Sequence, residues 1–310
     1  MANKIIFMGT PLFAVPILKS LYQNGFPISV VYTQPPQKSQ RGQKINKSPI
    51  QGISETLNID FRTPQTLKDS NEEYEFLKEL NADLAIVVAY GQIIPKNFLN
   101  LTKKGFINIH GSILPKWRGA APIQRSIMNR DDETGISIMK IVEELDSGPV
   151  GNIYKMKLEH NDNALEVSER LSLLAAEKIL DNIDDILDDK IKFIDQDHSK
   201  ATYAKKIDKS EGNINWNDDA LNIIGKINGL FPLPGAFFIF KGERYKILKA
   251  DLGNGIGKVG EVINNNLEIA CINSQSIKIL EIQRQGKKPQ KIGEFMLGSR
   301  IKKGSMINNV

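Results

Sequence analysis

Short apolar runs alternate with helical patterns through the first half of this 310-residue chain. The runs are rich in β-branched residues, which is typical of buried strands; they lie at 4–9, 28–33, 83–89, 105–111 and 134–142. Helical patterns stand between several of them, at 11–25, 73–81 and 120–130. Strands that alternate with helices favour parallel pairing through crossover helices. The pattern therefore predicts a doubly wound, Rossmann-like α/β domain, in which ligands bind outside the carboxyl ends of the strands.

The second half of the chain has a different organisation. Residues 163–190 form one long helical pattern, which closes the first domain. The following segment is polar and short of apolar periodicity, and predicts a linker at 195–208. Beyond it, short strand-like runs separated by Gly and Asn turns predict a small β-barrel. The expected domains are therefore 1–194 and 209–310.

Composition limits the class of protein. With 41% hydrophobic and 25% charged residues, the chain matches ordinary soluble globular proteins. Its apolar stretches are far shorter than the roughly 20 residues that span a bilayer, and its N-terminus lacks the features of a signal peptide. We expect a cytosolic protein with no membrane partner, and a monomer, although composition and spacing carry no signal for or against self-association.

Metal and nicotinamide chemistry find little support in the sequence. The single cysteine, Cys271, excludes an intramolecular disulfide and leaves no Cys cluster for zinc. His160 and His198 stand apart in polar surroundings, without the spacing of a metal site. Gly9-Thr10-Pro11 follows the first apolar run but is not a G-x-G-x-x-G fingerprint. We predict no metal.

The segment GFINIHGSILPKWRG, residues 105–119, contains an amide and an imidazole two residues apart. In a strand, Asn108 and His110 would project to the same face, where two donors could hold a developing oxyanion. An isolated imidazole, whose pKa is about 6.5, is only partly protonated at neutral pH, so a third partner is needed. Asp146, in the turn-like EELDSGPV, could orient His110, keep it charged and accept a proton from an attacking amine. Each residue alone is more often structural; the combination favours catalysis.

Four stretches around these residues carry a family resemblance: NIHGSILPKWRGAAPI, LDSGPV, GTPLFAVPILKSL and VVAYGQIIP. Over nearly the whole chain they resemble the 10-formyltetrahydrofolate-dependent formyltransferase family. The resemblance implies that Asn108, His110 and Asp146 perform formyl transfer, and that the second domain is an OB-like barrel suited to nucleic acid. It also implies 10-formyltetrahydrofolate as formyl donor, held by two segments: Ser112, Ile113, Leu114 and Pro115, and Tyr90, Gly91, Gln92 and Ile93.

The segment 34–49 is basic, and a loop of this kind separates family members that formylate charged tRNA from those that formylate small amines. It contains no acid and has five residues that we assign to tRNA contact: Lys38, Arg41, Gly42, Lys44 and Lys47. Members that act on charged tRNA carry a similar loop. Residues 209–310 also hold 15 Lys and Arg against 9 Asp and Glu, which suits contacts with phosphate. A disordered loop and a basic surface that serves only solubility remain the alternatives.

The resemblance thus implies a transferase that moves the formyl group to the α-amine of initiator methionyl-tRNA. One alternative keeps the chemistry and changes the acceptor to a sugar nucleotide, glycinamide ribonucleotide or water. Another is an RNA-binding module without catalysis, which gains nothing from Asn108, His110 and Asp146 occurring together.

Overall fold

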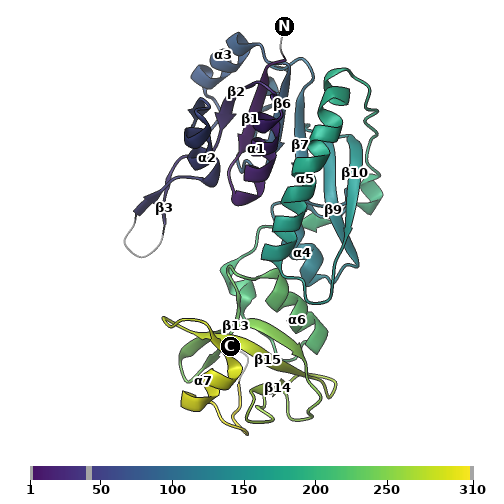
Figure 1. Cartoon of the computed structure of the whole chain (residues 1–310). Coiled ribbons are helices and arrows are strands. Elements are labelled where there is room, and N and C mark those ends of the chain that lie inside the picture. Colours follow the sequence, from purple (N-terminus) through teal and green to yellow (C-terminus); the bar gives the residue numbers. More distant parts are fainter. Residues whose placement is uncertain (1–2, 40–43, 308–310) are drawn as a thin grey trace. The chain divides into compact units, whose positions relative to one another are not determined.

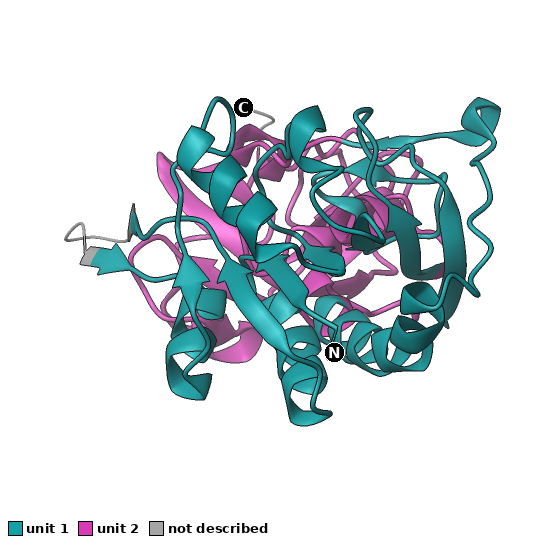
Figure 2. Ribbon diagram, turned by 90° about the horizontal axis from the view of Figure 1, so that it is seen from above, with its two compact units in different colours: residues 1–122, 134–156, 168–204 teal, residues 123–133, 157–167, 205–310 magenta. Residues whose placement is uncertain are grey.

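A computed structural model describes residues 3–39 and 44–307 of the chain. These residues form two compact units, coloured teal and magenta in Figure 2. The first comprises 1–122, 134–156 and 168–204, and the second 123–133, 157–167 and 205–310. The predicted linker, 195–208, is thus divided between them after Ala204. Its first ten residues belong to the first unit.

The first unit is built around a seven-stranded sheet (Figure 1). In sheet order the strands are β10 (Val150–Lys157), β9 (Glu133–Lys140), β7 (Phe106–His110), β6 (Leu84–Val88), β1 (Ile5–Gly9), β2 (Ile28–Tyr32) and β5 (Phe61–Arg62). The pairs from β7 to β5 are all parallel, and the chain order reverses between β1 and β6. This reversal confirms the predicted doubly wound, Rossmann-like sheet.

One strand runs against the prediction of parallel pairing. β9 pairs with β7 in the antiparallel sense, with Ser137 opposite His110 and Lys140 opposite Ile107. The carboxyl end of β9 therefore lies toward the amino end of β7. The predicted parallel pairing therefore does not extend to this strand, and the loop after β9 must return before Asp146 can meet His110.

Helices and short 3-10 turns connect the strands (Figure 1). They are η1 (Leu12–Ala14), α1 (Val15–Gln23), α2 (Pro49–Leu57), α3 (Asn71–Leu80), η2 (Lys96–Phe98), α4 (Pro122–Met128), α5 (Ala164–Leu187) and η3 (His198–Lys200). The predicted helix at 163–190 is confirmed by α5. α2 begins after Ser48, whose hydroxyl accepts from the backbone N–H of Gln51 at 2.9 Å. Such a cap satisfies a donor that the first helical turn leaves free.

Two short strand pairs lie outside the main sheet. β3 (Gln37–Ser39) and β4 (Lys44–Asn46) form an antiparallel hairpin inside the predicted basic loop. β8 (Arg118–Gly119) and β11 (Tyr203–Ala204) pair in parallel. The second of these pairs fastens the predicted linker to the segment after β7.

The second unit is an antiparallel β-domain, as predicted for the OB-like part. Its elements are η4 (Lys209–Gly212), α6 (Ala220–Gly229), β12 (Ala236–Phe240), β13 (Glu243–Leu252), β14 (Glu268–Ala270), β15 (Ser276–Arg284), β16 (Gln290–Lys291) and α7 (Ile292–Gly298). The strand order is β12-β13-β15-β14, and β16 pairs with β15. Trp216, Phe238 and Tyr245 anchor its core. Cys271 is a buried free thiol in that core, and burial raises its pKa to about 12.

Between residues 3 and 39 and between 44 and 307, no helix has the length and apolar character needed to cross a membrane. Within the same ranges, no three His, Cys, Asp or Glu side chains are grouped so as to hold a metal ion.

Candidate active site

Asn108 and His110 lie two residues apart on β7, so their side chains leave the same face of the sheet. Asn108 stands between Val87 of β6 and Met139 of β9, and is half-buried. Within the described part of the chain, its amide has no hydrogen-bond partner. An amide donor that the fold itself does not use is available to a ligand.

His110 is almost completely buried, with 6% of its surface exposed. Its Nε2 lies 3.0 Å from the carbonyl oxygen of Trp117. A carbonyl can only accept, so Nε2 carries a hydrogen and donates. The other ring nitrogen, Nδ1, is therefore the one that faces Asp146.

Asp146 occupies the loop between β9 and β10. Its Oδ2 lies 3.6 Å from Nδ1 of His110, which is too long for a hydrogen bond but close enough for a strong electrostatic contact. The same Oδ2 accepts from the backbone N–H of Gly119 at 2.8 Å. The two side chains are 7% and 15% exposed, so solvent screens their contact weakly. Despite the antiparallel β9, the loop thus returns Asp146 to His110.

Gly119 is a site residue that the sequence reasoning missed. Its φ is +117°, and a Cβ at this position would lie 2.8 Å from the carbonyl oxygen of Ala204. Only glycine allows β8 and β11 to approach this closely while the N–H of residue 119 points at Asp146. The signal in the sequence was the glycine that ends KWRG.

The predicted folate turn, Ser112–Pro115, is fastened to the strand beside His110. The hydroxyl of Ser137 donates to the carbonyl of Ser112 at 2.7 Å and accepts from the N–H of Leu114 at 3.1 Å. Ser112 and Leu114 are buried, whereas Ile113 and Pro115 are half-buried. Ser137, a lone hydroxyl in the apolar run ISIM, was a second residue that the sequence reasoning missed.

The second predicted folate segment, Tyr90–Ile93, follows β6. The Tyr90 side chain is 2% exposed and packs in the core of the first unit, where burial raises its pKa. The backbone carbonyl of Tyr90 accepts a hydrogen bond from Thr10 Oγ1 at 2.7 Å. Gln92 donates to the carbonyl of Pro64 at 2.8 Å, while Ile93 is 88% exposed. Gly91 accepts from Gln34 Nε2 at 2.9 Å.

The residues assigned to tRNA contact fall partly within the β3–β4 hairpin. Lys38 lies on β3 and Lys44 on β4. Lys47 follows β4 and pairs with Glu55 of α2 at 2.9 Å, both side chains being exposed. Arg41 and Gly42 lie outside the described residues. The segment predicted as a loop therefore includes two short strands.

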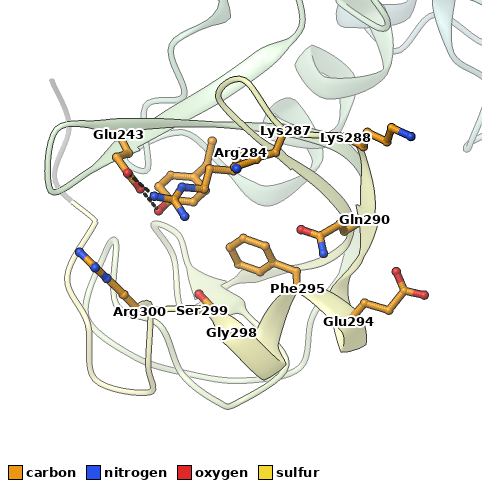
Figure 3. Close-up of a pocket in the computed structure, with 11 residues that line it drawn as sticks. Glu243, Arg284, Lys287, Lys288, Gln290, Glu294, Phe295, Gly298, Ser299 and Arg300 are labelled. Carbon is orange, nitrogen blue, oxygen red and sulfur yellow. Dashed lines mark hydrogen bonds and ion pairs between the residues drawn. The ribbon is translucent and has the colours of Figure 1, made fainter.

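A cavity of about 380 Å³ lies in the second unit, and its lining includes none of the residues predicted to be catalytic (Figure 3). Phe295 and Tyr245 form part of its wall, and Arg284 is ion-paired there with Glu243. Its other charged lining residues are Lys287, Lys288, Glu294 and Arg300. Cations thus outnumber carboxylates around this cavity.

Comparison with known proteins supplies an independent line of evidence. The family model described as formyl transferase matches residues 3–183, and the model of the formyl transferase C-terminal domain matches residues 206–300. A methionyl-tRNA formyltransferase of Pelagibacter ubique is 69% identical over 310 residues, which cover all of both chains. A methionyl-tRNA formyltransferase of Chelativorans is 40% identical, covering 99% of this chain and all of the relative.

Solved structures share the fold at lower identity. A sugar 3N-formyltransferase, WlaRD, crystallised with dTDP and 5-N-formyl-THF, has a TM-score of 0.69 and 22% identity, covering 93% of this chain and all of its own. An N-formyltransferase of Helicobacter canadensis, in complex with folinic acid and dTDP-3-aminofucose, has a TM-score of 0.68 and 19% identity. It covers 92% of this chain and all of its own. At such identities the likeness concerns the fold alone.

Proposed function

Since this chain belongs to the formyl transferase family, we propose that it transfers the formyl group of 10-formyltetrahydrofolate to the α-amine of initiator methionyl-tRNA. The product is N-formylmethionyl-tRNA, which serves translation initiation. The observation that carries this proposal is the 69% identity to a methionyl-tRNA formyltransferase along the full length of both chains. The sugar formyltransferases are only 22% and 19% identical, which favours the tRNA acceptor over a sugar nucleotide.

In this reaction the amine attacks the formyl carbon of the donor and a tetrahedral oxyanion forms. Asn108 offers to that oxygen an amide that has no partner among the described residues, and His110, oriented by the Trp117 carbonyl, lies on the same face of β7. Asp146 lies 3.6 Å from the imidazole and stabilises its positive charge. The carboxylate also takes up the proton that the amine loses. Collapse of the oxyanion breaks the bond from carbon to the folate nitrogen, which takes the proton held by Asp146 and leaves as an amine.

The folate donor is assigned to the carboxyl edge of β6 and β7. The strands are parallel, with Val87 opposite Asn108, so the segment after β6 and the segment after β7 begin at the same edge of the sheet. The exposed Ile93 provides an apolar surface there, and the turn 112–115 is held rigidly by Ser137. A planar, partly apolar pterin suits this combination. The core position of Tyr90 limits its contribution to the backbone.

A labelled donor tests the function directly. The protein should release labelled formyl from 10-formyltetrahydrofolate to charged initiator tRNA, and do so poorly with a dTDP-amino sugar or with no acceptor. Equal transfer to the amino sugar would favour the small-acceptor alternative, and formate release without acceptor would favour a hydrolase. Binding of tRNA without any formyl transfer would favour the alternative of an RNA-binding module without catalysis.

We assign two surfaces to tRNA binding. One is the β3–β4 hairpin, with Lys38, Arg41, Gly42, Lys44 and Lys47. The other is the basic second domain, residues 209–310. The cations around the cavity in Figure 3 support the latter assignment. Phosphate contacts release counterions, so affinity should fall steeply as salt rises.

Reversing two charges at this cavity should weaken tRNA binding. In the double variant Lys287→Glu and Lys288→Glu, we expect the slope of log affinity against log salt to fall by about two, one for each lost phosphate contact. Filter binding or fluorescence anisotropy at several salt concentrations measures this slope. The double variant Lys19→Glu and Lys68→Glu, with both lysines exposed in the first unit, changes the net charge equally and serves as the control. An identical slope in both double variants would contradict the assignment.

A further inference from the structure

The side chain of Gln196 joins two segments of the candidate active site. It is 7% exposed, and its Nε2 donates to the carbonyl oxygens of Asp146 at 2.9 Å and Gly148 at 2.7 Å. Its Oε1 accepts from Arg118, with Nη2 at 2.8 Å and Nε at 3.1 Å. The amide thus uses both of its N–H groups and both lone pairs. Its orientation is fixed from two sides.

Arg118 connects this amide to the other half of the site. It is 1% exposed and stands between Trp117 and Gly119 in the chain. The carbonyl of Trp117 accepts from His110, and the N–H of Gly119 donates to the Asp146 carboxylate. Hydrogen bonds from Arg118 to Gln196, and from Gln196 to Asp146, therefore close a ring around the contact between the imidazole and the carboxylate.

The backbone of Asp146 needs such support. Its φ is +46°, in the left-handed region that residues with a side chain seldom adopt. A disfavoured conformation persists only where the surrounding structure holds it. Gln196 binds the carbonyl of Asp146 itself and that of Gly148 two residues later, so its two hydrogen bonds hold the turn that aims the carboxylate.

We propose that Gln196 is a positioning residue for formyl transfer, acting through the two carbonyls to keep the Asp146 carboxylate beside His110. This rests on the proposed function. Gln196 itself touches no reacting atom. The residue belongs to the segment that the sequence predicts to be a linker, so part of the catalytic apparatus lies where only a connection was expected.

Two substitutions separate positioning from folding. Gln196→Glu keeps oxygen acceptors for the guanidinium of Arg118 and removes the donors to the two carbonyls, so its folded fraction should exceed that of Gln196→Ala, which loses the acceptor as well. Gln196→Ala removes the acceptor for Arg118 and the donors to the two carbonyls. In single-turnover assays normalised to the folate-binding fraction, we expect both variants to lower the rate by about 10²-fold, as for a misplaced catalytic group. The KM for each substrate should change less than about twofold, because groups that act only in the transition state affect kcat.

A double-mutant cycle shows whether Gln196 acts through Asp146. In an Asp146→Asn background, Gln196→Ala should cause little further loss, whereas an independent structural effect would multiply the two losses. Gln51→Ala is the matched control, because Gln51 is also a glutamine of the first unit with 7% exposure. Multiplicative losses, or unchanged rates in both Gln196 variants of an active enzyme, would overturn this proposal alone. An inactive wild type would overturn the proposed function and this proposal with it.

Discussion

Replacing Asp146 with Asn is expected to lower kcat for formyl transfer by about 10²- to 10⁴-fold, the usual contribution of a positioned acid or base. The amide oxygen can still accept from the N–H of Gly119, so the loop should keep its place. What is lost is the negative charge 3.6 Å from His110, and with it both the stabilisation of the imidazolium and the acceptor for the amine proton. Single-turnover transfer from labelled donor to charged tRNA measures the effect.

Asp83→Asn provides a control for this substitution. Asp83 resembles Asp146 in its surroundings: it accepts from the backbone N–H of Lys4 at 2.7 Å, lies 2.7 Å from a cationic Lys103, and is 16% exposed where Asp146 is 15% exposed. It precedes β6, at the opposite end of that strand from the candidate site. The variant should turn over normally per folded molecule. If both aspartate variants kept a rate near that of the wild type, the assigned role of Asp146 would be wrong.

Replacing Gly148 with Ala is expected to cause the largest loss of stability among single methyl additions at this site. A Cβ on residue 148 would lie 1.9 Å from the carbonyl oxygen of Lys140, a backbone atom that cannot rotate away. Lys140 is held by β9, and its own N–H donates to the carbonyl of Pro149 at 2.9 Å. The backbone must shift, so we expect a cost on the order of 3 kcal/mol in the free energy of unfolding. Chemical denaturation measures it, and turnover should fall as well, because the displaced turn carries Asp146.

Gly52→Ala is expected to stabilise the protein, in contrast to Gly148→Ala. Gly52 lies within α2, and a Cβ there would meet no atom within 4 Å. Alanine in an open helical position should raise the free energy of unfolding by about 0.5 to 1 kcal/mol. A Gly148→Ala protein as stable as the wild type would mean that the turn before β10 is looser than described.

The parts of the fold that were predictable are those with a local signal. The helix α5 and the strands β1, β2, β6 and β7 are long, periodic or strongly apolar, so pattern alone found them. Asn108 and His110 were predicted to share a face because strand alternation needs only a spacing of two. β3 and β4 have three residues each, too few for alternation to be visible.

What escaped prediction depends on the path of the chain in space. The antiparallel direction of β9 is not encoded in its own residues, which are buried from Thr134 to Met139 like those of a parallel strand. Gln196 gave no signal, because a polar residue in a polar segment matches a linker. Its partners are 50 and 78 positions away in sequence, and only the folded chain brings them together. Asp146 was assigned from its turn, and only the folded chain shows that the loop after the antiparallel β9 brings it to His110.

The pairing of β11 with β8 has a practical consequence for exchanging the second domain between relatives. A chimaera with its crossover soon after residue 183, where the first family match ends, would bring a foreign partner to Arg118 and Gly119. A crossover after Ala204 would leave the native ring around the carboxylate intact. The boundary suited to recombination therefore lies about twenty residues further along than the family match suggests.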